Sequence, residues 1–198
     1  MRVVRVSGNP LKALPSELSH YRANAEELRV FGHLWYSDRC LGDFADAVIH
    51  KQPRSLLAIT GDHWSRRCLE PRPSIFERKA VPMVFYAPEI LSVLTHPPRI
   101  AGSHNDILPT LIGLAAPTGF VYHAFGRNLF DISQPQVGFG SQMVVTPDAI
   151  FEVEPSAGPE SLEGQRLQSS AQFSELGLRY RQVHAVAWWR ITKGNLLP

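Results

Sequence analysis

Three observations predict an α/β protein. A helical periodicity extends over residues 25–49, and two short apolar runs, 55–60 and 81–88, follow it. A polar loop that contains several arginines and prolines separates these two runs. A helix, a buried strand, a long loop and a second buried strand are typical of an open α/β sheet with functional loops at one edge.

Residues 2–6 form a predicted short strand, and a turn-rich loop follows it. The helix predicted over 25–49 rests on apolar side chains that recur at i, i+3/4 and i+7. We expect it to end before Pro53, because the residue that precedes a proline disfavours helical backbone. The apolar positions are Leu28, Phe31, Trp35, Leu41, Phe44 and Val48.

The apolar runs 55–60 and 81–88 are continuous rather than alternating. A short continuous run bounded by turn residues is typical of a strand that is buried on both faces, as in a parallel sheet. We therefore expect both runs in the interior of such a sheet.

A further helix is predicted over 103–115. Asn105 or Asp106 can cap its free backbone N–H groups, and Pro109 is tolerated within the first turn.

The C-terminal part predicts a hairpin followed by a helix. The hairpin is predicted over residues 141–155, with Pro147 and Asp148 at its turn. A Gly-, Ser-, Glu- and Gln-rich link at 156–170 leads to an amphipathic helix near 171–189. We expect residues 1–155 to form one α/β unit, and residues 156–198 to be a linker and a helix that packs on it.

Composition excludes several classes of protein. With 198 residues and 44% hydrophobic side chains, the chain can form one core. The formal net charge is only +2 and no run of Lys or Arg occurs, so no nucleic-acid partner is predicted. We expect no export signal and no membrane span in these residues. Two cysteines, Cys40 and Cys68, are too few for a disulfide scaffold.

The sequence Gly61-Asp62-His63 follows the first apolar run directly. Ligands of open α/β sheets bind outside the carboxyl ends of the strands, which is where this tripeptide is placed. A carboxylate oxygen and an imidazole nitrogen are common ligands of Zn²⁺ or Mn²⁺. The alternative is an ordinary strand end, at which Asp62 caps the next turn and His63 is a polar surface residue.

Other polar residues near this tripeptide have two interpretations each. Arg66 and Arg67 can clamp phosphate or sulfate oxygens, or can be solvated loop charges. Trp64 can line a pocket or belong to the core. For His104 and Asp106, beside the start of the 103–115 helix, we favour capping over a role in ligand binding or catalysis.

A nucleophile motif is not evident in these residues. The sequence contains neither Gly-x-Ser-x-Gly nor Cys-x-Pro-x-Arg, and we expect the side chain of Thr60 to lie within its strand. Asp62 and His63 alone would be an incomplete metal site, because a catalytic Zn²⁺ has at least three protein ligands.

Four segments in order resemble the C-terminal part of the sulfatase-like domain of the alkaline phosphatase superfamily, and most of all the lipoteichoic acid synthase and phosphoglycerol transferase family. They are "LWYSDRCLGDFADAV", "AITGDHWSRR", "FERKAVPMVFYAPEIL" and "SHNDILPTLIGLA" with the later "FGRNLF". The resemblance covers roughly residues 3–153. It implies part of an alkaline-phosphatase-like mixed sheet flanked by helices, with a small C-terminal hairpin-plus-helix region.

By this resemblance, Asp62 and His63 match the family's Asp-His metal ligands, and the ion would be Mn²⁺, Zn²⁺ or Mg²⁺. Arg66, Arg67 and Trp64 would line the substrate pocket. In such enzymes the metal also holds a Thr, Ser or modified Cys nucleophile, which attacks a phosphate or sulfate ester.

The chain departs from the family pattern in three ways. The family's nucleophile and acidic ligand lie upstream of the region that resembles this chain. Gly8 or Asn9 stands where the family has a substrate-contacting histidine before the first helix. A later family histidine is also absent, and Arg66 or Arg67 can stand in for it.

We therefore expect the C-terminal portion of a metal-dependent phosphotransferase or hydrolase. We expect it to be inactive alone and to need the missing N-terminal half of the domain or a partner chain. The substrate would be a phosphoglycerol, phosphoethanolamine or sulfate ester. The resemblance implies the extracytoplasmic face of the cytoplasmic membrane. The alternative is a non-catalytic remnant, or a partner-completed subunit of the same fold, that acts as an interaction protein.

Overall fold

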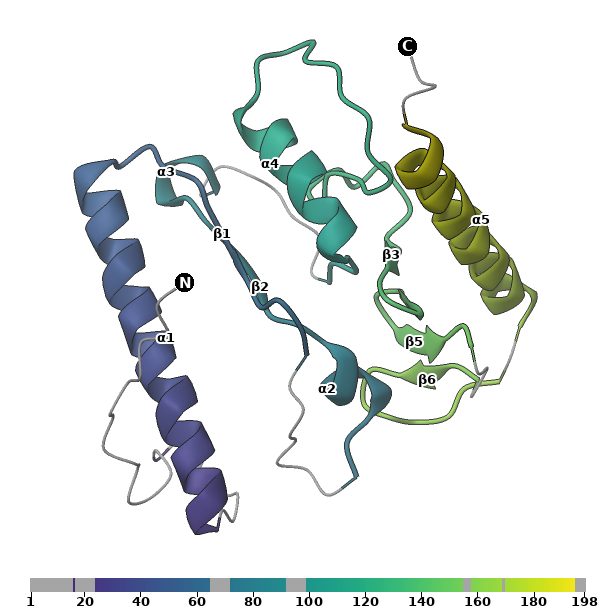
Figure 1. The fold of residues 1–198 in the computed structure, drawn as a ribbon, viewed down its shortest axis with the longest axis horizontal. Helices are drawn as coiled ribbons and strands as arrows, with labels where there is room; N and C mark the ends of the chain where they lie inside the picture. The colour runs from purple at the N-terminus through teal and green to yellow at the C-terminus, as the bar shows by residue number, and fades with distance from the viewer. Residues whose placement is uncertain are drawn as a thin grey trace.

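The computed structural model describes residue 16 and residues 24–64, 72–91, 99–154, 158–168 and 170–194. It has a mixed α/β architecture with two small antiparallel sheets (Figure 1). This confirms the predicted α/β class. The strand expected at residues 2–6 lies outside the described residues.

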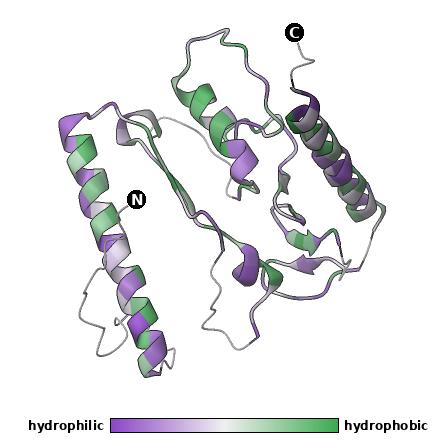
Figure 2. Ribbon diagram, viewed as in Figure 1, coloured by the Kyte–Doolittle hydropathy of each residue, from purple (hydrophilic) through white to green (hydrophobic). Residues whose placement is uncertain are grey.

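Helix α1, Ala25–Lys51, confirms the first predicted helix and ends at Lys51 rather than at residue 49. The side chain of Asn24 accepts hydrogen bonds from the backbone N–H groups of Glu26 and Glu27. The Glu27 carboxylate in turn accepts from the Asn24 N–H at 2.7 Å, which completes a capping box. Ala45 is the buried residue of this helix, which stands apart from the second sheet (Figure 1). Polar and apolar residues are interspersed along it (Figure 2).

The two apolar runs form β1, Leu57–Thr60, and β2, Met83–Tyr86. These strands pair antiparallel, so the expected parallel arrangement is wrong. The expected burial on both faces is also wrong, because residues of β1 alternate between half-buried and exposed. An apolar run indicates a tendency to be buried but not the direction of the neighbouring strand. In the described part of the connection between these strands the helix is α2, whose five residues are fewer than the long crossover that joins parallel neighbours needs.

Two short helices flank β2. Helix α2, Ile75–Lys79, precedes the strand and begins with a capping box formed by Ser74 and Glu77. Ile75 packs in a buried cluster with Met143 and Ile150, which joins α2 to the second sheet. Helix α3, Pro88–Leu91, follows β2.

The helix predicted over 103–115 is present as a 3₁₀ turn, η2 (His104–Asp106), and the helix α4 (Ile107–Ala115). Pro109 lies in the first turn of α4, as predicted, and it is buried. The Asp106 carboxylate accepts a hydrogen bond from the Ser103 N–H at 2.7 Å. The predicted capping by Asp106 thus serves the start of η2, and its side chain makes no cap hydrogen bond to α4.

The second sheet has the order β3-β4-β5-β6 and is antiparallel throughout. The predicted hairpin is confirmed, since β4 and β5 pair and Thr146 and Ala149 close the turn between them. The segment 156–170, expected as a link, contributes β6 to this sheet. The strands are β3 (Gly138–Phe139), β4 (Met143–Val145), β5 (Ala149–Glu152) and β6 (Glu160–Ser161).

Helix α5, Ala171–Lys193, confirms the last predicted helix and packs against β4. Tyr180 is its anchor: the ring is buried with Val144 and Phe151, and its hydroxyl oxygen accepts a hydrogen bond from the Gln142 N–H at 2.8 Å. Gln142 has a φ of 59°, so this hydrogen bond holds a left-handed residue at the start of β4. None of the helices that the structure describes is long and apolar enough to cross a membrane.

Candidate functional site

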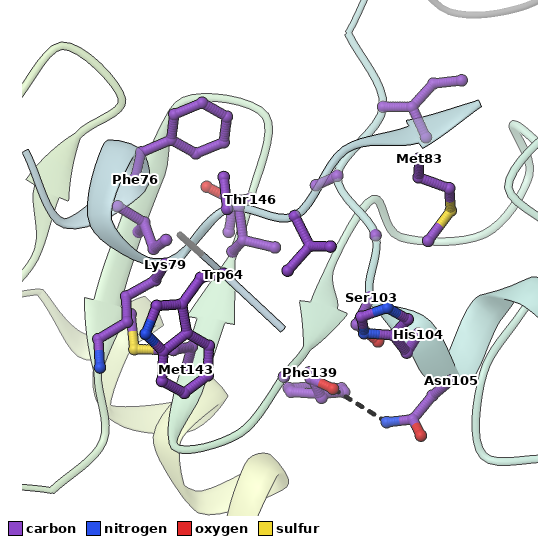
Figure 3. Close-up of a pocket in the computed structure, with 18 of the residues that line it drawn as sticks. Trp64, Phe76, Lys79, Met83, Ser103, His104, Asn105, Phe139, Met143 and Thr146 are labelled. Carbon is purple, nitrogen blue, oxygen red and sulfur yellow. Dashed lines mark hydrogen bonds between the residues drawn. The ribbon is translucent and has the colours of Figure 1, made fainter. Parts of the chain in front are cut away.

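A cleft of about 980 Å³ lies at the end of β1, between the β1–β2 ribbon and the second sheet (Figure 3). Asp62, His63 and Trp64 line it from the segment that follows β1. Much of the remaining wall comes from α2, β2, η2 and the second sheet, and includes Phe76, Lys79, Met83, His104, Phe139 and Met143. The Gly-Asp-His sequence therefore opens onto a cleft large enough for a small ligand.

Asp62 and His63 lie close enough to hold one ion. Asp62 Oδ1 is 3.8 Å from His63 Nε2, and the two side chains are 93% and 55% exposed. His63 Nδ1 is 2.6 Å from the backbone oxygen of Trp64. A carbonyl oxygen only accepts, so in the neutral ring Nδ1 carries the proton and Nε2 keeps the lone pair that can bind a ligand. A second hydrogen bond of this kind, which fixes the tautomer, is usual for metal-binding histidines.

Asp62 and His63 supply some, but not all, of the ligand atoms that a metal site needs. One carboxylate oxygen and one neutral imidazole nitrogen suit Zn²⁺ or Mn²⁺, and the carboxylate also suits Mg²⁺. Within the described part of the chain, no group of three or more His, Cys, Asp or Glu side chains could hold a metal ion. The predicted pair is thus brought together as an incomplete ligand set.

Trp64 is half-buried and forms one wall of the cleft, as one of its two interpretations predicts. Lys79 Nζ lies 4.5 Å from the centroid of the Trp64 ring and 3.9 Å from Glu152 Oε1. The ammonium group therefore links the segment after His63 to β5 while it remains beside the cleft (Figure 3). Sequence reasoning missed Lys79, because no motif connects it with Trp64.

Arg66, Arg67 and Cys68 lie outside the described residues. The proposed contacts of Arg66 and Arg67 with substrate remain predictions. The described cations that line the cleft, besides the histidines, are Lys79 and Arg99. Arg99 Nη1 is 3.6 Å from Asp148 Oδ1 at an exposed position.

His104 has a role that the sequence does not reveal. Its Nε2 lies 2.9 Å from the backbone oxygen of Gly61 and 3.2 Å from Thr60 Oγ1. We expected a cap, yet η2 places this ring against the end of β1. The Thr60 hydroxyl donates to the Pro82 oxygen at 2.9 Å, so Thr60 joins the end of β1 to the residue before β2.

Asp106, by contrast, is a structural residue. It is 3% exposed, and its carboxylate accepts hydrogen bonds from Ser103 and from the backbone N–H of Arg127 at 2.9 Å. It does not line the cleft, which agrees with the preference for capping over catalysis. Burial lowers the pKa of the neighbouring Arg127 guanidinium, whereas the Asp106 charge opposes that shift.

No protein-family model matches the chain, and searches of the curated proteins and of the solved structures found no match.

Proposed function

We propose that this chain carries the Asp-His half of a metal site in a phosphotransferase or hydrolase that acts on phosphate-type esters. The lineage proposed is the sulfatase-like domain of the alkaline phosphatase superfamily, with an alkaline-phosphatase-like sheet. The supporting observation is the pair formed by Asp62 and His63. Their donor atoms are 3.8 Å apart at the end of β1, with His63 Nε2 free to bind and a cleft beside them.

In this proposal, Asp62 and His63 hold a divalent ion together with ligands from the rest of the domain or from a partner chain. The ion, Mn²⁺, Zn²⁺ or Mg²⁺, would supply charge stabilisation to the transferred group. Lys79, Arg66 and Arg67 bind the anionic ester, and Trp64 forms the wall against which it lies. Lys79 is suited to this because it faces the cleft and is only partly neutralised by Glu152 at 3.9 Å.

The uncovered surface supports an incomplete domain. Large apolar side chains of α1 are part of this surface, including Leu34, Trp35 and Phe44. A surface of this kind is characteristic of an interface. In this proposal, the missing half of the domain or a partner chain covers that surface.

Metal binding tests the proposal directly. We expect Mn²⁺, added to the isotope-labelled chain, to broaden the amide signals of residues 61–64 selectively, at low affinity because two protein ligands hold it. Asp62→Asn and His63→Ala should each abolish this broadening. Because both side chains are exposed, neither change should lower stability appreciably.

Matched controls lie on α1, where Asp46→Asn and His33→Ala change exposed residues of the same types. Both should leave the Mn²⁺ effect intact. Equal broadening in Asp62→Asn, or none in the unsubstituted chain, would contradict the proposal. In that case the alternative, a non-catalytic interaction protein of the same fold, is favoured.

The intact mass of the native product separates two forms of the proposal. A mass well above 22.1 kDa would mean that the same polypeptide supplies the missing nucleophile and acidic ligand. A mass of 22.1 kDa would mean that a partner chain must complete the site. The proposed location, the extracytoplasmic face of the cytoplasmic membrane, rests on the family resemblance.

A further inference from the structure

The peptide that joins Gly61 to Asp62 sets the direction in which Asp62 and His63 leave β1. Glycine has more backbone freedom than any other residue, so contacts must restrain this peptide. A Cβ at position 61 would lie 3.0 Å from Val81 Cγ1 and 3.4 Å from the His63 oxygen. Close packing thus explains the glycine, but these contacts do not involve its carbonyl oxygen.

The side chain of His104 restrains that carbonyl. Its Nε2 is 2.9 Å from the Gly61 oxygen, and because that oxygen only accepts, Nε2 must carry the proton. Thr60 Oγ1 is 3.2 Å from the same nitrogen, and its hydroxyl lies 2.9 Å from the Pro82 oxygen and 3.4 Å from the Gly61 oxygen. The shorter contact to the Gly61 oxygen is therefore the one from His104. The Gly61 oxygen and the Asp62 N–H belong to one planar peptide, so a fixed oxygen also fixes the backbone of Asp62.

His104 is itself held on a rigid platform. Asp106, buried behind it, anchors η2 through the Ser103 N–H at 2.7 Å and the Arg127 N–H at 2.9 Å. The side chain of Asn105 donates to the Phe139 oxygen at 2.9 Å, which ties η2 to β3 (Figure 3). Gly126 packs directly on η2, because a Cβ there would overlap the Asn105 oxygen. Because η2 is held in place, a hydrogen bond from His104 can also hold the end of β1 in place.

We propose that His104 is a positioning residue for the Asp62–His63 pair: its Nε2–H holds the Gly61 carbonyl and so orients both side chains towards one ion. This inference rests on the proposed function. It assigns a role to a residue 41 positions downstream of His63, outside the Gly-Asp-His sequence. The role of His104 is that of an outer-shell hydrogen bond, which orients the ligands of a metal without touching it.

Two amide substitutions test the role of the Nε2–H. In His104→Gln, the side-chain nitrogen is as many bonds from Cα as the histidine Nε2, so it can still donate to Gly61. In His104→Asn, the nitrogen is one bond closer to Cα and does not reach. The exposed position of His104 means that both variants should fold with unchanged melting temperature.

Two measurements follow on both variants. We expect His104→Asn to raise amide hydrogen exchange at Asp62 and His63 severalfold, and to weaken Mn²⁺ binding about tenfold, as loss of an outer-shell partner does. We expect His104→Gln to restore both values to within about twofold of the unsubstituted chain. A purely structural role would instead shift the melting temperature of both variants equally.

The outcomes separate this inference from the proposed function. If exchange at Asp62 and His63 is unchanged in His104→Asn, the positioning role is overturned whether or not Mn²⁺ binds. If Mn²⁺ does not bind the unsubstituted chain, the proposed metal site fails, whereas the exchange measurement still decides whether His104 orders the end of β1. If both variants weaken Mn²⁺ binding alike, the Nε2–H is not the reason and the inference is overturned.

Discussion

Replacement of Asp106 by asparagine should destabilise the fold strongly. The carboxylate is 3% exposed, with Oδ2 accepting from the Ser103 N–H at 2.7 Å and Oδ1 from the Arg127 N–H at 2.9 Å. Asparagine keeps one acceptor oxygen and turns its NH₂ group towards the other N–H. One backbone donor then loses its partner, and the remaining hydrogen bond loses its charge.

A lost charge-assisted hydrogen bond and an unpaired buried donor together correspond to about 2–4 kcal/mol. We expect Asp106→Asn to lower the free energy of unfolding by this amount in urea titrations followed by circular dichroism. Asp46→Asn, at an exposed position on α1, should change it by less than about 0.5 kcal/mol. A loss for Asp106→Asn no larger than that of the control would refute the anchoring role of Asp106.

Two further predictions concern the second sheet and the loop after α4. Tyr180→Phe removes the acceptor of the Gln142 N–H and should cost about 1–2 kcal/mol in the same urea assay, whereas Tyr122→Phe, at an exposed site, should cost little. The hydroxyl of Ser133 donates a hydrogen bond to Asp131, and so does the Ser133 backbone N–H; in this order of importance they lower the pKa of the Asp131 carboxyl. The ionised carboxyl therefore stabilises the fold at pH values above the unfolded pKa, and this contribution is lost as pH falls through the folded pKa. Ser133→Ala should therefore raise the pKa of Asp131 in a ¹³C-carboxyl NMR titration, while Ser141→Ala should not; an unchanged pKa in Ser133→Ala would show that the hydroxyl is not its cause.

The elements that sequence reasoning predicted well are those with a strong local signal. The apolar periodicity of residues 25–49 predicts α1, and the turn residues Pro147 and Asp148 predict the β4–β5 hairpin. Both predictions succeed because each signal depends only on residues that are neighbours in the chain. The direction of β2 relative to β1 was predicted wrongly. Both directions are compatible with the same apolar runs, and the length of the intervening loop does not decide between them.

The site was predicted in part for the same reason. Asp62 and His63 were placed at a strand end from the local order of an apolar run and a Gly-Asp-His sequence, and the structure has them there. His104 and Lys79 could not be found this way. Their partners, Gly61 and Trp64, lie far from them in the chain, and only the folded arrangement brings them together.

The incomplete ligand set and the uncovered surface have one explanation under the proposed function. Among the described strands, β1 pairs only with β2, so no described strand occupies its other edge. A strand added to that edge and parallel to β1 would end beside Asp62 and His63, because the carboxyl ends of parallel strands meet at the same edge of a sheet. Residues that follow such a strand are therefore well placed to supply further ligands, and the enlarged sheet would offer a face on which the exposed apolar side chains of α1 can pack. One added segment would thus complete both the metal site and the core, which makes this edge of β1 the place to look for it.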